Sequence, residues 1–455
     1  MKKLVFLPVE TEVRELDAKL LMASKLVSKD IACFVGQHNF LNKLVPLYKE
    51  GVYMGKNIFL ENMNSSNAIF DIYKAAGFSI LWNHEEGAIY GGDQEKWDNE
   101  LRELLDPCRL KSDDMILCWG EYQKKFYDSY HSGIPSKVVG GYRLDLGQES
   151  QLYKLIENKN RVELKDYILI DTNCAWGNHF MPNQVEYVKY QKKAENTKSS
   201  HFTKHNLVGL LSEDLIKIGY FCELISYLIK NNPKMKFVLR PHPTESISFY
   251  KNVFHGFKNI HITKEYSAVE WIMNCKTLIQ SGCTTSLEAF FMKKPIVSFH
   301  PFETKYSVNV TQCLGNKCSK FEEVDNFINN PSAINDLTLD EFGLKTLIAN
   351  FNSKSSSIEL IVNEILGKLK DKRHNKIDIK KIKRIEQYEH FYNSIKFLPR
   401  KYFFKNKEEA YQMAIDHFPG FDKRNIEQKV QFLSKQLKKK IKIQYFSKNL
   451  TLLSE

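Results

Sequence analysis

The sequence lacks the features of membrane-spanning proteins and of secreted proteins stabilised by disulfides. No apolar run approaches the roughly 18–20 residues that a membrane-spanning helix needs. Its nine cysteines are scattered without a CxxC pair, and Cys313 and Cys318, the two closest together, lack the second half of a zinc site. The opening MKKLVFLPVETEVRE meets Pro8 and then acidic residues, so it predicts a first strand rather than a signal peptide. We therefore expect a cytoplasmic protein with reduced thiols and no metal.

Two common nucleotide-binding signatures are also missing. The chain has no GxxxxGK[ST] segment, which excludes a P-loop, and no GxGxxG segment, which argues against a redox dinucleotide. Any nucleotide must therefore be held by other loops, and no cofactor is expected.

The length and the charge of the chain suggest several parts. A chain of 455 residues suits two or three domains of about 100–200 residues each. The net charge of +12 is uneven, because residues 371–455 hold 21 Lys/Arg against 10 Asp/Glu and the remainder holds 45 against 44. Such a basic segment can meet nucleic acid, an anionic membrane or an acidic polymer, and charge alone does not choose among them.

Short apolar runs alternate with helix-like stretches through two consecutive parts of the chain. β-Branched and aromatic runs bounded by Gly, Asn or Asp predict buried strands. The expected strands are Lys3–Val9, Ile31–Val35, Phe78–Trp82, Met115–Trp119 and Lys137–Val139, and then 167–171, 236–240, 259–263, 277–280 and 295–299. Strands that alternate with helices predict parallel βαβ units. The expected fold class is α/β, with two Rossmann-like lobes whose parallel sheets face each other across a cleft.

This pattern also sets the expected boundaries. We expect a first lobe over residues 1–150, a second over 165–345 and a basic helical extension over 346–455, with the polar segment Gln148–Asp166 as linker. Met181–His205 is polar and aromatic without clear periodicity, and we interpret it as a long functional loop.

Apolar spacing predicts three amphipathic helices. They cover Val13–Val27, Leu215–Ile229 and a tail segment with Ile426, Val430, Leu433 and Leu437 on one face.

The segment RPHPTES (Arg240–Ser246) begins at the last residue of an expected strand. Two prolines hold His242 in a stiff turn at the carboxyl end of that strand, where ligands of open α/β sheets collect. There His242 can donate to a phosphate or ribose oxygen, and Arg240 can neutralise charge. A surface turn with a capping histidine is the alternative, which the position at the strand end disfavours.

A second segment, SGCTTSLEAFFMKKPIVSF (Ser281–Phe299), runs from a strand end through a hydroxyl-rich turn into a helix that opens near Ser286. Free backbone N–H groups and hydroxyls at a helix start suit a phosphate. Glu288 either accepts ribose hydroxyls or only favours the helix dipole. Together with the first segment, this turn predicts a nucleotide pocket in the second lobe. Its candidate residues are Ser281, Gly282, Thr284, Thr285, Ser286 and Glu288.

These residues resemble a known family. RPHP followed by S-G-x-T-x-S-L-E-A-x-x-x-x-K-P is similar to the donor lobe of GT-B glycosyltransferases that use CMP-activated sugars. Further stretches resemble the bacterial surface carbohydrate biosynthesis proteins, which include the retaining transferases of the ulosonic acid Kdo. These are LPVETEVRELDAKLLMA, NHEEG (83–87), GGYRLDL (140–146), ILIDTN (168–173) and HFPGF near the end. GGYRLDL departs from the G-N-P-R-x-D form of the family, and RPHP and S-L-E also recur in glycerophosphotransferases and sialyltransferases.

The resemblance implies a reaction without metal, since a CMP donor leaves with a single phosphate and the chain has no DxD signature. Hydrogen bonds from His242 and the 281–286 turn would assist the departure of CMP. If configuration is retained, a carboxylate must attack before the acceptor does. Asp171, at the end of YILID and close to Asn173, is the candidate nucleophile, and the resemblance implies the same residue. An Asx turn or helix cap is its alternative role.

The first lobe is expected to hold the acceptor. Glu85 and Glu86 follow an apolar strand, and alternation lets only one of them serve as general base. Glu10 and Arg14 are candidates for the acceptor or sugar site, whereas for Asp17 we expect a structural ion pair. In GGYRLDL, Arg143 and Asp145 either bridge the lobes or form a salt pair.

The leading hypothesis is a glycosyltransferase that moves an ulosonic acid, Kdo first, from CMP to a bacterial surface glycan or lipid-linked acceptor. The basic tail would rest on the anionic inner face of the membrane. A CMP-nonulosonate transferase, a CDP-glycerol-type phosphotransferase and a non-catalytic scaffold of polysaccharide assembly remain alternatives. Nucleic acid is not an expected partner, because the tail has few interleaved aromatic and basic residues.

Overall fold

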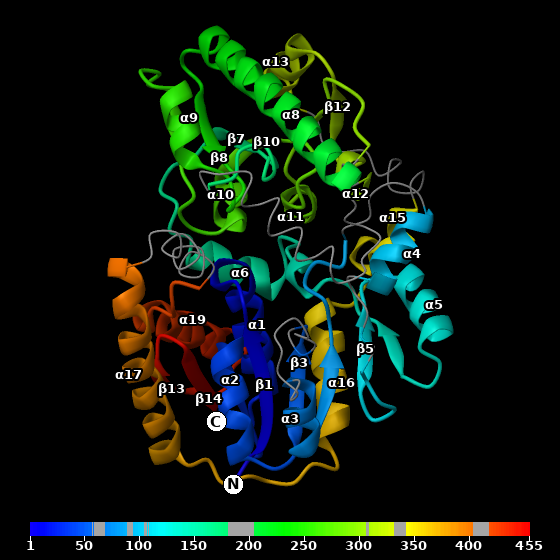
Figure 1. Cartoon of the computed structure of the whole chain (residues 1–455), viewed down its shortest axis with the longest axis vertical. Coiled ribbons are helices and arrows are strands. Elements are labelled where there is room, and N and C mark those ends of the chain that lie inside the picture. The colour runs from blue at the N-terminus through cyan, green and yellow to red at the C-terminus, as the bar shows by residue number, and fades with distance from the viewer. Residues whose placement is uncertain are drawn as a thin grey trace.

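The computed structural model describes residues 1–56, 58, 69–88, 94–103, 107, 109–180, 204–305, 309–331, 343–403 and 418–455. Two α/β lobes are stacked along the long axis of the molecule, and the C-terminal elements return to the first lobe (Figure 1). Within these residues no helix combines the length and the apolar character needed to cross a membrane.

The first lobe is built on an eight-stranded sheet with the order β13-β14-β2-β1-β3-β4-β5-β6. Its parallel strands are β1 (Lys3–Val9), β2 (Ile31–Gln37), β3 (Gly51–Gly55), β4 (Phe78–Trp82), β5 (Met115–Cys118) and β6 (Ser136–Val138). These strands are apolar because helices cover both faces of a parallel sheet. The helices of this lobe are α1 (Glu12–Leu26), α2 (His38–Leu44), α3 (Ile69–Ala75), α4 (Gln94–Glu103) and α5 (Glu121–Tyr130), with short 3₁₀ turns η1 (Val45–Leu47) and η2 (Tyr142–Leu144).

The second lobe contains a six-stranded parallel sheet with the order β12-β11-β10-β7-β8-β9. Its strands are β7 (Tyr167–Asp171), β8 (Lys236–Arg240), β9 (Ile260–Ile262), β10 (Cys275–Gln280), β11 (Ile296–Phe299) and β12 (Asn316–Cys318). Helices α8 (Lys204–Asn231), α9 (Ile247–Val253), α10 (Ala268–Asn274), α11 (Thr285–Phe291), α12 (Asn309–Gln312) and α13 (Phe321–Asn329) complete it. The α/β class and the two Rossmann-like lobes predicted from the sequence are therefore confirmed.

The C-terminal segment differs from the helical extension that the sequence predicts. Its helices α15 (Leu344–Leu347), α16 (Ser357–Leu369), α17 (Ile379–Phe403) and α19 (Lys423–Gln436), with the 3₁₀ turn η4 (Ala349–Phe351), are joined by two strands, β13 (Lys442–Ser447) and β14 (Leu450–Ser454). Strand β14 pairs antiparallel with β2 and buries Leu450, Leu452 and Leu453 there. The segment therefore completes the first lobe, because the exposed edge of β2 needs a partner.

Three further expectations have mixed outcomes. The segment expected as a linker contains helix α6 (Gln151–Asn158), whose N-cap Ser150 accepts from the backbone N–H of Tyr153. Strands β3 and β12 are additional to those expected. The expected loop 181–205 lies almost wholly outside the described residues, and α8 already begins at Lys204.

Candidate active site at the junction of the lobes

A row of polar side chains lies at or next to the carboxyl ends of four neighbouring strands of the second sheet. In the strand register, Asp171 of β7 lies between Arg240 of β8 and Gln280 of β10, and Ser298 of β11 follows Gln280. Because parallel strands end at the same edge, residues far apart in the sequence meet here. The sequence-predicted Asp171 and Arg240 are thus brought side by side.

Asp171 is a buried carboxylate, 1% exposed, and neither of its oxygens has a close, well-directed hydrogen bond among the described residues. Burial raises its pKa to about 6, although the Arg240 guanidinium and the Thr285 hydroxyl act in the opposite direction. A cap or an Asx turn needs a hydrogen bond from a neighbouring backbone N–H to the carboxylate, and neither oxygen accepts one from the described residues.

The loop after β8 presents His242 as a neutral hydrogen-bond donor. Its Nδ1 accepts from the backbone N–H of Thr244 at 3.3 Å and lies 2.8 Å from the Thr244 hydroxyl. Burial lowers the pKa of His242 to about 4, and Lys264 adds to this effect. Since Nδ1 accepts, the ring hydrogen sits on Nε2, which is left to donate.

Glu245, which is not among the residues predicted for the site, connects the loops after β7 and β8. Its Oε1 accepts from the Thr172 hydroxyl at 2.9 Å, the backbone N–H of Cys174 at 3.1 Å and that of His242 at 3.0 Å. Its Oε2 accepts from the Tyr250 hydroxyl at 2.7 Å. Glu245 is completely buried. The only signal in the sequence was its place within RPHPTES.

The turn after β10 has a left-handed glycine and is hydrogen-bonded to the loop after β7. Gly282 has a φ of +73°, a left-handed conformation that glycine adopts without strain. Its carbonyl accepts from the Asn173 side chain at 2.9 Å, so Asn173 ties the β7 loop to this turn.

The hydroxyls of this turn differ in their availability. Ser281 and Ser286 are buried, and Ser286 donates to the Cys283 carbonyl at 2.9 Å. Thr285 donates to Cys283 Sγ at 3.1 Å, and Thr284 is exposed. The hydroxyl of Ser286 is therefore already engaged, and helix α11 begins one residue before the predicted start.

In the first lobe, the two adjacent glutamates occupy different environments. Glu85 is 2% exposed, accepts from the Tyr142 hydroxyl at 3.1 Å and lies 3.5 Å from the fully buried Lys19 ammonium. Glu86 is more exposed and pairs with Arg14 at 2.6 Å. Against the effect of burial, Arg14 and Lys56 lower the pKa of Glu86 to about 2. Of the two side chains, that of Glu86 is the more accessible, with 41% of its surface exposed against 2% for Glu85.

Two further acidic residues of the first lobe form ion pairs. Glu10 pairs with Lys56 at 2.9 Å. Asp17, for which a structural ion pair is expected, pairs with Lys429 of α19 at 2.5 Å. This pair anchors the C-terminal segment to α1.

Three arginines surround Glu288 where the lobes meet. Arg143 Nη1 of the first lobe lies 3.5 Å from Glu288 Oε1 of the second, and its Nη2 donates to the Glu85 carbonyl at 2.9 Å. Burial raises the pKa of Glu288, while Arg143, Arg14 and Arg240 act to lower it. A cavity of about 20 Å³, room for about one water, lies against Arg14, Arg143 and Glu288. The junction therefore brings Arg14 and Arg143 of the first lobe together with Glu288 of the second.

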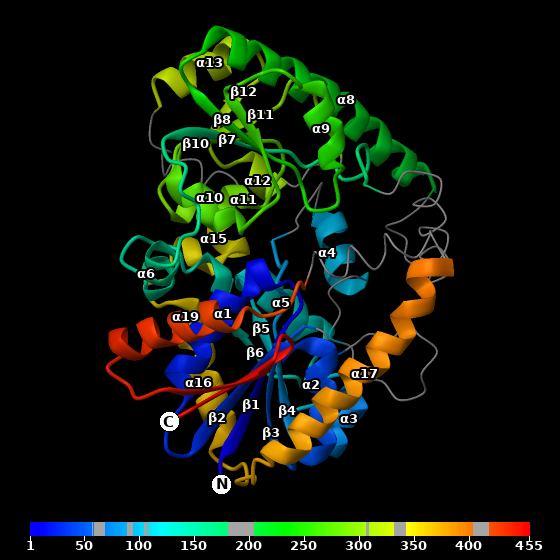
Figure 2. The same cartoon turned by 90° about the vertical axis from the view of Figure 1, so that its left-hand side faces the viewer.

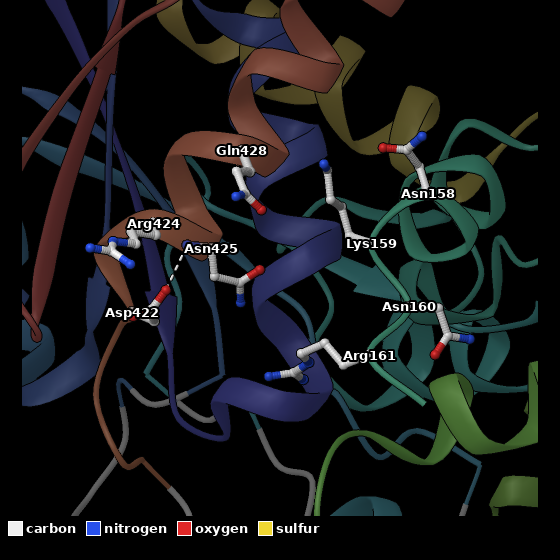
Figure 3. Close-up of a pocket in the computed structure, with 8 residues that line it drawn as sticks. All are labelled: Asn158, Lys159, Asn160, Arg161, Asp422, Arg424, Asn425 and Gln428. Carbon is white, nitrogen blue, oxygen red and sulfur yellow. Dashed lines mark hydrogen bonds between the residues drawn. The ribbon is translucent and has the colours of Figure 1, made fainter. Parts of the chain in front are cut away.

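A larger polar pocket lies apart from these residues. It has a volume of about 480 Å³ between the end of α6 and the first turns of α19 (Figure 3). Arg161 in its wall is held by two hydrogen bonds to Glu270 at 2.8 Å. It contains none of the predicted site residues, and the described residues hold no cluster of three or more potential metal ligands.

No protein-family model and no curated protein matches the chain. Among solved structures, it is similar to UDP-GlcNAc 2-epimerase from Methanocaldococcus jannaschii in complex with UDP-GlcNAc and UDP, with 12% identity, 81% of this chain and 100% of that chain covered, and a TM-score of 0.42. S. aureus MnaA with UDP gives 10% identity, 83% and 100% coverage and a TM-score of 0.45. The wall teichoic acid polymerase TagF gives 12% identity, 81% and 90% coverage and a TM-score of 0.41. These are distant similarities of backbone architecture.

Proposed function

We propose that the chain is a glycosyltransferase that moves an ulosonic acid, Kdo in the first instance, from its CMP-activated donor to a bacterial surface glycan. The observation that carries the proposal is Asp171, a buried carboxylate at the sheet edge that lies beside Arg240 and has no close hydrogen bond to the described residues. With a pKa near 6, it is mostly ionised at neutral pH and available as a nucleophile.

The proposed reaction proceeds in two displacements. A carboxylate oxygen of Asp171 attacks the anomeric carbon while the bond from that carbon to the phosphate oxygen breaks, and CMP leaves with the electron pair. The acceptor hydroxyl oxygen then attacks the same carbon, the bond to Asp171 breaks, and the hydroxyl proton passes to a carboxylate. Two inversions give net retention.

The charges around the junction suit a donor with two anionic groups. A CMP-ulosonate carries a phosphate and a carboxylate, and Arg14, Arg143 and Arg240 act together on Glu288. The Nε2–H of His242 would donate to the leaving phosphate. Together these groups would stabilise charge as the glycosidic bond breaks.

Glu86 is the proposed acceptor base, because Glu85 is enclosed by Lys19 and Tyr142. The low pKa of Glu86 makes it a weak base, so it would take the proton late, after the bond to the acceptor has begun to form.

A donor panel tests the proposal. The protein is incubated with CMP-Kdo, a CMP-nonulosonate or CDP-glycerol, each with a glycan acceptor, and released CMP is measured. We expect acceptor-dependent release from CMP-Kdo that Asp171→Asn abolishes and that Asp166→Asn leaves intact. Asp166 is a matched control, because it is exposed and lies immediately before the other end of the same strand.

The other donors separate the alternatives. Release from the nonulosonate alone would change the sugar but keep the mechanism. Release from CDP-glycerol that survives Asp171→Asn would indicate a phosphotransferase, which needs no carboxylate nucleophile. If no donor releases CMP and the protein does not bind CMP, the non-catalytic scaffold is the remaining alternative.

A further inference from the structure

Helix α17 lies along the first lobe and is attached to it by one face. Ile382 is fully buried, Ile385 is half-buried, and Glu389 pairs with Lys43 of α2. Further along, the helix runs outward from the body of the lobe (Figure 2). Its other face is therefore presented to the surroundings.

That outer face carries a cluster of exposed aromatic side chains. Tyr388 is 64% exposed, Phe391 63% and Tyr392 48%. The rings of Tyr388 and Tyr392 are stacked one helical turn apart, with centroids 6.2 Å apart. Exposed aromatic residues grouped in this way mark interaction sites more often than solvent-facing surface.

Basic residues precede the aromatic cluster on the same helix. Lys380, Lys381, Lys383 and Arg384 are all exposed, against the acidic Glu386 and Glu389 on the same part of the helix. The acidic Glu389 is already neutralised by Lys43. The exposed part of α17 thus has an unbalanced positive charge beside its aromatic side chains.

We propose that this face of α17 binds an anionic lipid membrane, with the helix lying in the plane of the interface. Lys and Arg would meet lipid phosphates, and the aromatic rings would enter the region between headgroups and acyl chains. Single-stranded nucleic acid is held by a basic groove with aromatic platforms, whereas this face is the convex side of a helix. A flat bilayer fits it better.

Vesicle co-sedimentation of the full chain tests this inference. We expect at least about tenfold stronger binding to vesicles of phosphatidylcholine mixed with phosphatidylglycerol than to phosphatidylcholine alone, weakening as salt is added. Replacing Tyr388, Phe391 and Tyr392 by Ser should reduce binding about tenfold. Replacing Lys380, Lys381 and Arg384 by Glu should remove the preference for the anionic lipid.

The control variant replaces Tyr130 and Val253 by Ser, which are 44% and 42% exposed on other elements. It should bind vesicles like the unchanged protein. Equal binding of all variants, or binding that ignores lipid charge, would overturn the inference. The inference would also be overturned if the aromatic variant kept its vesicle binding and lost only oligonucleotide binding, measured by filter binding, or self-association, measured by light scattering.

This inference does not depend on the sugar chemistry. CMP release with a water-soluble acceptor should be unchanged in the α17 variants, so failure of membrane binding and failure of the proposed transfer are read separately.

Discussion

Arg143 of the first lobe lies 3.5 Å from Glu288 of the second, and the same guanidinium donates to the backbone of Glu85. One side chain therefore contacts the candidate acceptor loop and the candidate donor lobe together. Both members of the pair are about nine-tenths buried, with side-chain exposures of 10% and 12%.

Arg143→Ala should destabilise the closed arrangement of the lobes, because it leaves the buried Glu288 without its nearest countercharge. Removing one partner of a buried pair costs about 3 kcal/mol. Urea denaturation should report this loss, and the double variant Arg143→Ala, Glu288→Gln should recover part of it. A double variant as unstable as the sum of the two single variants would show that the pair is not coupled.

Asp171→Asn should stabilise the protein above pH 6. The folded-state pKa of Asp171 is about 6 and its ordinary value is 3.8, so its contribution to stability is present below pH 3.8 and is lost as pH rises through 6. A shift of about two units corresponds to about 3 kcal/mol. Melting temperatures should therefore rise in the variant at pH 7.5 and differ little near pH 4. A gain of the same size at both pH values would contradict a buried charge as the cause.

The strands of the second lobe, and the polar residues at their carboxyl ends, can be predicted from short stretches of the sequence. Buried strands such as YILID and KFVLR are continuous apolar runs, and parallel strands must end together. Asp171 and Arg240 were therefore predictable as neighbours.

Other features depend on contacts between distant parts of the chain. Glu245 acts by joining the loops after β7 and β8, and nothing in its own neighbourhood specifies that partner. The Arg143–Glu288 pair depends on how the lobes dock. The pairing of β14 with β2 spans almost the whole sequence, so it was missed while the helix α19 before it was found.

Glu245→Ala should lower both stability and activity. It leaves the backbone N–H groups of His242 and Cys174 and the hydroxyls of Thr172 and Tyr250 without their acceptor, at a cost of about 1–3 kcal/mol for each buried donor left unpaired. Glu245→Gln keeps the shape and should lose less. Thermal denaturation checks this against Glu223→Gln on the exposed side of α8. Equal melting temperatures for all three variants would show that the hydrogen bonds of Glu245 do not stabilise these loops.

Asp145 neither bridges the lobes nor pairs with Arg143. It caps α16 by accepting from the Ser356 hydroxyl at 2.6 Å and the backbone N–H groups of Ser357 and Ile358 at 3.0 and 2.8 Å. Asp145→Ala should cost about 2 kcal/mol, the upper range for a helix cap. Limited proteolysis should cut faster between residues 350 and 358. An unchanged cleavage rate would mean that packing alone holds this helix start.

The most direct test of the account is the intact mass of the protein after incubation with CMP-Kdo or a CMP-nonulosonate without acceptor. A covalent intermediate on Asp171 predicts a mass increase of one sugar, absent in Asp171→Asn and present in Asp166→Asn. An adduct that persists in Asp171→Asn would contradict the assignment of the nucleophile. CMP release that depends on acceptor, with no adduct at any time, would contradict the double displacement.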